Sequence, residues 1–86
     1  MTNNVQENVF KIFGNRERVQ LLSCLTKPIC VTELLQKCHL SQSALSQHLR
    51  ILRLAKAVEC VRDGKKQIYS ITDKNLLKIA NELLKY

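Results

Sequence analysis

Short hydrogen-bonding side chains gather on one side of a leucine-bearing segment, LSQSALSQHLRIL at residues 40–52. Leu45, Leu49 and Leu52 recur at i, i+4 and i+7, a spacing that predicts a helix with these leucines buried. The opposite side of that helix collects polar residues that lack a carboxylate: Ser43, Ser46, Gln47, Arg50 and Arg53. Such side chains match the base edges of DNA, because Gln pairs with adenine and Arg with guanine or phosphate.

The same polar residues are also compatible with a helix face that only meets solvent. Solvated faces, however, are usually rich in Glu and Lys, which are better helix formers than Ser. No Glu or Asp occurs between Gln42 and Arg53, where DNA phosphates would repel a carboxylate. We therefore favour DNA contact for the residues of this segment and its first turn: Ser41, Gln42, Ser43, Ser46, Gln47, Arg50 and Arg53.

Positive charge is concentrated just after this segment. The formal net charge is +7 at pH 7, and residues 50–66 hold six basic and two acidic side chains. A basic surface favours a polyanionic partner or an acidic membrane surface, although solvation alone explains many such surfaces.

Two β-prone runs, residues 58–62 and 67–71, flank a DGKK sequence whose glycine suits a tight hairpin turn. A hairpin that directly follows a helix-turn-helix is a wing. We expect Arg62 at its base and Lys65 and Lys66 at its tip to meet phosphates or the minor groove. The alternative is a hairpin whose lysines only protect an edge strand.

The elements that must position these residues form one domain spanning residues 1–86, since a chain of this length builds one modest core. The pattern predicts a mainly α fold, a winged helix-turn-helix with about five helices and one β-hairpin. The helix-turn-helix covers residues 32–55 and the wing residues 57–71. A second helix is expected to run to about Leu25. The predicted N-caps are side chains that accept hydrogen bonds: Asn15, Thr32, Ser41 and Thr72.

The first and last helices, residues 1–13 and 73–86, carry more apolar surface than a small core can cover. Their apolar positions are Val5, Val9, Ile12 and Phe13, then Leu76, Leu77, Ile79, Ala80, Leu83 and Leu84. We therefore predict a homodimer joined by these two helices. Two-fold symmetry would present two recognition helices to an inverted repeat with half-sites roughly 34–36 Å apart.

Several classes of protein are not expected. The chain lacks the long apolar run of a membrane span and the start of a signal peptide, which predicts a cytoplasmic protein associated with the nucleoid. No paired catalytic carboxylates, phosphate loop or nucleophile–base arrangement is visible, so we expect neither an enzyme nor a cofactor. The predicted partner is double-stranded DNA; a winged helix that instead binds another protein is the main competitor.

The residues quoted above also carry a family resemblance. LSQSALSQHLRIL and VRDGKKQIYSI resemble the recognition helix and wing of the ArsR/SmtB family of bacterial repressors, and FGNRERVQLLSCL resembles the family's second helix. The resemblance covers roughly residues 10–72. It implies a dimeric winged helix-turn-helix repressor that is released from its operator by a metal, metalloid or thiol-reactive signal.

This resemblance also implies that His48 faces the DNA groove or its walls, whereas a neutral histidine packed inside the protein is an equal alternative. One departure concerns Lys56, which stands near the place where such repressors usually have Gly at the exit of the recognition helix. A lysine in a left-handed conformation there would cost ~1 kcal/mol.

The family's inducer sites are only partly matched by this sequence. In ICVTEL, Cys30 fits the Cys-Val-Cys pattern of arsenic-responsive members, but Thr32 replaces the second cysteine. The last helix has no histidine, so Asp73 alone does not make the zinc-type site. The two-thiol switch of the oxidant-responsive members needs a cysteine in the last helix, and none follows Cys60.

Three interpretations of the cysteines remain open. Stable disulfides are not expected without an export signal, so the cysteines can be small buried hydrophobes, a role that suits Cys38 and Cys60 best. A thiol switch that uses Cys24 with Cys30 is the second interpretation. A metal site from Cys30, Cys38 and His39, making the protein a metal-responsive repressor, is the third; its spacing matches no recognised zinc pattern, and we assign no metal ligands.

Overall fold

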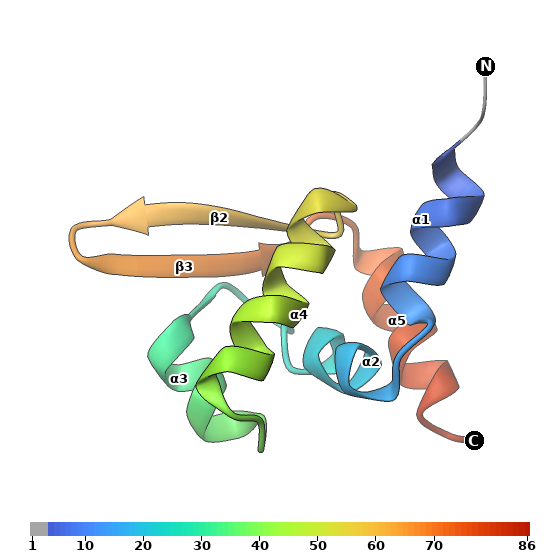
Figure 1. Cartoon of the computed structure of the whole chain (residues 1–86), viewed down its shortest axis with the longest axis horizontal. Coiled ribbons are helices and arrows are strands. Elements are labelled where there is room, and N and C mark those ends of the chain that lie inside the picture. The colour runs from blue at the N-terminus through green and yellow to red at the C-terminus, as the bar shows by residue number, and fades with distance from the viewer. Residues whose placement is uncertain (1–3) are drawn as a thin grey trace.

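The computed structural model of the chain describes residues 4–86, with side chains from residue 8 onward. It contains five helices and a three-stranded antiparallel sheet, which confirms the predicted winged helix-turn-helix (Figure 1). The elements in chain order are α1 (Asn4–Phe13), α2 (Arg16–Ser23), β1 (Ile29–Cys30), α3 (Val31–Lys37), α4 (Gln42–Leu54), β2 (Val58–Asp63), β3 (Lys66–Ile71) and α5 (Lys74–Leu83).

Two helices begin at the N-caps that the sequence predicts. The Asn15 side chain accepts hydrogen bonds from the backbone N–H groups of Glu17 and Arg18, at 2.8 and 3.2 Å. Ser41 Oγ accepts from the N–H of Ala44 at 3.1 Å. Each cap satisfies backbone donors that the first helical turn leaves free, so these residues fix where α2 and α4 start.

The other two predicted caps are wrong. Helix α3 begins at Val31, so Thr32 lies inside it, and Cys30 at the N-cap makes no side-chain capping bond. Helix α5 is capped by Asp73, whose carboxylate accepts from the N–H of Asn75 at 2.9 Å. The segment after Pro28 enters a short strand and reaches α3 two residues earlier than a Thr32 cap would require. Asp is at least as good an N-cap as Thr.

Thr72 instead fastens the end of the wing to the end of α4. Its hydroxyl donates to the carbonyl oxygen of Lys56 at 2.7 Å, and its N–H donates to the carbonyl of Ala57 at 3.0 Å. Lys56 has φ 62°, the left-handed conformation expected from its position. The N–H of Ala57 bonds the carbonyl of Leu52 at 2.8 Å, which closes α4 with a Schellman-type turn.

The sheet has the strand order β1-β3-β2, with every neighbouring pair antiparallel. Strands β2 and β3 form the wing, which pairs Val58 with Ile71 at its base and Asp63 with Lys66 at its tip. Strand β1 pairs Ile29 with Tyr69 and was not predicted, because two residues carry no readable alternation. In Figure 1 the wing extends to one end of the molecule, while α1 and α5 lie at the opposite end.

Leucines from three helices and one connecting segment form the centre of the core. The largest side chains that are almost fully buried are Leu21, Leu22, Leu25, Leu34, Leu45 and Leu52. Burying each such side chain contributes ~1.5–3 kcal/mol, so this cluster supplies much of the stability of a domain of this size. The leucines of α4 therefore fix which side of that helix faces outward.

Candidate nucleic-acid interface

The outward side of α4 carries the polar residues that the sequence singled out. Leu45, Leu49 and Leu52 are 1%, 3% and 0% exposed, so the leucine stripe faces the core as predicted. The polar residues of the helix that are exposed are Gln42, Ser43, Ser46, Gln47, Arg50 and Arg53. Four of them line one open depression: Ser43, Ser46, Gln47 and Arg50. The amphipathic pattern thus presents hydrogen-bonding groups at the surface.

A second, larger groove joins this face of α4 to the wing. It has a volume of about 600 Å³ and is lined from α4 by Gln42, Ser46, Arg50 and Arg53, with Leu49 and Leu54 beside them. Its other walls come from Val31 at the start of α3 and from Gln67 and Tyr69 on β3. The recognition face and the wing therefore belong to one continuous surface, and no carboxylate is among the residues that line either depression.

Tyr69 marks the inner edge of this groove. Burial and a hydrogen bond with Cys60 raise the pKa of the Tyr69 hydroxyl, while the neighbouring Arg53 guanidinium acts in the opposite direction. The phenol therefore stays neutral at physiological pH. Gln67 and Tyr69 were not predicted as groove residues, because the pairing of β1 with β3 that sets their position could not be read from the sequence.

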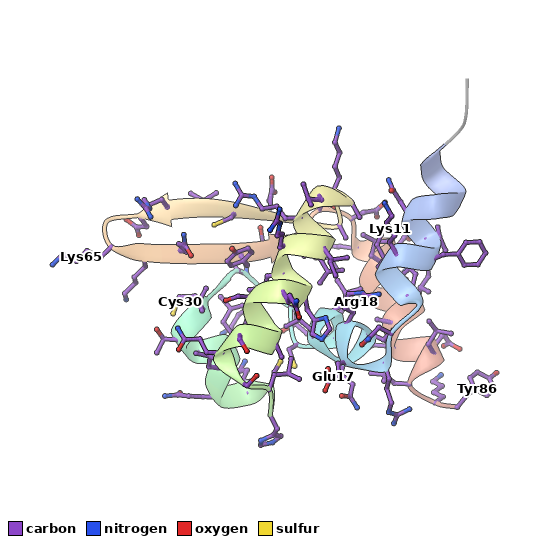
Figure 2. The ribbon with its side chains drawn as sticks, in the orientation of Figure 1. Lys11, Glu17, Arg18, Cys30, Lys65 and Tyr86 are labelled. Carbon is purple, nitrogen blue, oxygen red and sulfur yellow. The ribbon has the colours of Figure 1, made fainter. Side chains whose placement is uncertain are left out.

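Three basic side chains lie toward the far end of the wing. Lys65 occupies the turn at the tip, next to Gly64 with φ 63°, and points away from the body of the molecule (Figure 2). Lys66 pairs with Asp63 in the last pair of the ladder. Arg62 pairs with Gln67, one step from the tip, so its predicted place at the base of the wing is wrong. The base of the hairpin is formed by Val58 and Ile71, four residues from Arg62 along β2.

His48 lies on the inner side of α4 rather than on the exposed polar face. It is 8% exposed, and its Nε2 donates to Oε1 of Glu17 on α2 at 3.0 Å. Its other ring nitrogen, Nδ1, is buried and has no hydrogen-bond partner among the described residues. The structure thus favours the packed histidine over the one that faces the groove. Glu17, which lies in the first turn of α2, was not predicted to hold the recognition helix.

The cysteines are paired differently from the predicted switch. Cys38 Sγ lies 3.2 Å from Cys24 Sγ, whereas Cys30 Sγ lies 3.3 Å from a carboxylate oxygen of Glu33. Cys38 is buried, as expected for a small apolar side chain, and Cys60 is partly buried. Cys24 therefore has Cys38, not Cys30, as its neighbouring thiol.

The described part of the chain has neither a cluster of metal-binding side chains nor a membrane-spanning helix. No three His, Cys, Asp or Glu side chains are grouped so that they could hold a metal ion, so Cys30, Cys38 and His39 do not form such a group. Among residues 4–86, no helix is both long and apolar enough to cross a membrane.

Comparison with known proteins connects this architecture to one family. Residues 15–59 match the model of the bacterial regulatory proteins of the arsR family. An uncharacterised HTH-type transcriptional regulator of Methanocaldococcus jannaschii is 31% identical over 80 residues, which cover 87% of this chain and 90% of that protein. A transcriptional repressor SmtB homolog of Synechocystis is 32% identical over 75 residues, 86% of this chain and 57% of that protein.

The fold comparison gives the same result. The crystal structure of the transcriptional repressor BigR from Xylella fastidiosa superposes with a TM-score of 0.83 at 30% sequence identity, covering 95% of this chain and 85% of that one. The matched family segment contains α2, α3 and α4, and so includes the whole exposed polar face. This chain belongs to the ArsR family of bacterial regulatory proteins.

Proposed function

We propose that this protein is a transcriptional repressor that binds double-stranded operator DNA by placing α4 in the major groove. The observation that carries the proposal is the carboxylate-free polar face of α4, anchored from behind by three buried leucines and continuous with the wing. The family match supports it, as do the similar proteins named as regulators and repressors. The protein would accordingly act at the nucleoid.

Within this interface, different side chains take different roles. The exposed amides and hydroxyls of α4 read base edges: Gln42, Ser43, Ser46 and Gln47. The exposed cations hold phosphates or guanine: Arg50 and Arg53 on α4, and Arg62, Lys65 and Lys66 on the wing. Ser41 contributes through the cap that orients α4, and His48 contributes by fastening α4 to Glu17.

The proposal includes a homodimer formed through α1 and α5. Both helices expose large apolar side chains: Val9 and Phe10 are 43% and 68% exposed, and Ile79 and Leu83 are 43% and 42% exposed. The two helices lie at the end of the molecule opposite the wing tip (Figure 1). Covering them with a second copy would leave both recognition helices free to read an inverted repeat.

Gln47 and Lys65 give a matched pair of variants that test direct readout. An operator is first selected from a random duplex library at moderate ionic strength, and binding is then measured on that operator and on a random duplex. Gln47→Ala should cost ~1–3 kcal/mol on the operator and little on the random duplex, because Gln47 reads a base. Lys65→Ala should weaken both DNAs and flatten the salt dependence, because Lys65 meets phosphate.

Two outcomes contradict the proposal. Equal losses on both DNAs for Gln47→Ala would remove base readout from α4. A selection that enriches no sequence would remove the operator altogether and leave a winged helix that serves to bind another protein.

A further inference from the structure

Two thiols meet where the C-terminal ends of α2 and α3 lie side by side. Cys24 is the C-cap of α2 and Cys38 is the C-cap of α3, and 13 residues of chain separate them. The Cys38 thiol donates a hydrogen bond to Cys24 Sγ, with the sulfurs 3.2 Å apart. A disulfide requires a sulfur separation of about 2.05 Å, so the two atoms must approach by about 1 Å to form the bond.

The thiol pair is open to small molecules from one side. Cys24 and Cys38 line a cavity of about 260 Å³, together with charged or titratable side chains from three segments: Glu17, Lys37 and His39. Cys24 is partly buried and Cys38 is 7% exposed. A reagent of the size of a peroxide can therefore enter the cavity and reach Cys24 first.

The two sulfurs differ in burial and therefore in reactivity. Burial, with a further contribution from the hydrogen bond to Cys24, raises the pKa of Cys38 to about 12. Cys38 consequently remains a protonated thiol at neutral pH and does not attack first, because the thiolate is the reactive form. Cys24 accepts the hydrogen bond from Cys38 and is the more exposed of the two sulfurs, so a reagent in the cavity meets Cys24 first.

We propose that Cys24 and Cys38 are a redox-active dithiol that a hydroperoxide oxidises to a disulfide, lowering the affinity of the protein for DNA. Cys24 gives up its proton to solvent and its thiolate attacks one peroxide oxygen. The O–O bond breaks, Cys24 becomes a sulfenic acid, and the leaving hydroxide takes up a proton to become the first water. Cys38 then attacks the Cys24 sulfur, the S–O bond breaks, and the hydroxyl leaves with the Cys38 proton as water. In total, two thiols and one hydrogen peroxide give one disulfide and two waters.

The link to DNA lies in the turn that follows Cys38. The Cys38 carbonyl accepts a hydrogen bond from the N–H of Leu40 at 2.7 Å, and Ser41 next along the chain caps α4. Formation of the S–S bond requires Cys38 to move toward α2 by about 1 Å. This movement would displace the turn that holds Ser41 and, with it, the start of the recognition helix. This consequence rests on the proposed function, whereas disulfide formation does not.

The experiment treats the full chain with hydrogen peroxide and uses two independent readouts. Peptide mass spectrometry locates the disulfide, and binding to the selected operator is measured before oxidation, after oxidation and after dithiothreitol. We expect a bond between Cys24 and Cys38 and at least a tenfold loss of operator affinity that dithiothreitol reverses. Cys24→Ser and Cys38→Ser should each abolish both effects, while Cys30→Ser and Cys60→Ser, the matched controls, should keep them.

Any other result contradicts either the proposed disulfide, its effect on DNA binding, or the proposed function. If peroxide joins other cysteines or none, the dithiol is wrong, whatever the DNA results. If the expected disulfide forms but a functional operator complex keeps its affinity, the coupling to α4 is wrong. A reduced protein that binds no duplex selectively defeats the proposed function, while the mass spectrum still decides whether the dithiol exists. Should Cys38→Ser fail to fold, Cys24→Ser, at the more exposed position, decides the same question.

Discussion

Lys56 is the one described non-glycine residue with a positive φ, and it ends the recognition helix. A side chain with a Cβ costs ~1 kcal/mol in this left-handed conformation, a cost that glycine avoids. We predict that Lys56→Gly raises the free energy of unfolding by up to about 1 kcal/mol relative to Lys56→Ala, which retains the Cβ. Urea denaturation of both variants measures the difference. Equal stability of the two would mean that the Schellman-type turn relieves the strain without glycine.

The Cys38 thiol should make stability depend on alkaline pH. Its pKa is raised from 9.0 in the unfolded chain to about 12 in the folded protein, chiefly by burial. The unfolded state therefore loses this proton first, so the stabilising contribution is complete below pH 9 and decreases as pH rises toward 12. We predict that the free energy of unfolding falls more steeply above pH 9 in the parent than in Cys38→Ala. Parallel profiles would contradict the buried, protonated thiol.

At the scale of single residues, periodicity alone places most of the polar face. The leucine spacing of α4 determined that Ser43, Ser46, Gln47 and Arg50 face outward, and the structure agrees. His48 lies at the boundary of that pattern, and its contact with Glu17 on α2 could not be read from the spacing. Contacts between distant segments, such as Cys24 with Cys38, depend on how helices pack, and no local pattern in the sequence contains that information.

At the scale of elements, the N-terminus of α5 tests how a helix start is chosen. Both Thr72 and Asp73 are suitable caps by residue type, but the Thr72 hydroxyl is already bonded to the end of α4, and Asp73 caps the helix. We predict that Asp73→Ala costs about 1 kcal/mol of stability, whereas Asp73→Asn, which keeps the capping oxygen, costs little. Thermal or urea unfolding separates the two variants. An equal loss in both would assign the effect to the negative charge near the helix N-terminus instead.

The long elements were predictable because each repeats its pattern several times. Helix α4 and the wing contain repeated apolar positions and clear turn residues, so their types were predicted correctly. Strand β1 has two residues and α3 has seven, too few for a period to identify their ends. Their limits are set by pairing with β3 and by packing against it, which is also why the cap assigned to Thr32 was wrong.

At the scale of the whole molecule, α1 and α5 leave apolar side chains in contact with water, and a second copy of the chain would cover them. Phe10 is 68% exposed and Ile79 is 43% exposed, whereas Ile12 and Ala80 on the same two helices are buried in the core. A substitution at the exposed positions therefore changes the surface without opening a cavity, so it tests association separately from folding.

We predict that Phe10→Asp and Ile79→Asp convert a dimer into a folded monomer, because each would bury a carboxylate in the proposed interface. Sedimentation at micromolar concentration measures the mass, and circular dichroism checks folding. Val61→Asp is the matched control: Val61 is 59% exposed on the wing, so its substitution should leave the dimer intact. The monomeric variants should also lose most affinity for an inverted repeat while keeping weak binding to one half-site, since only the dimer engages both. A parent protein that sediments as a monomer would remove α1 and α5 as dimerisation helices and, with them, the two-fold operator.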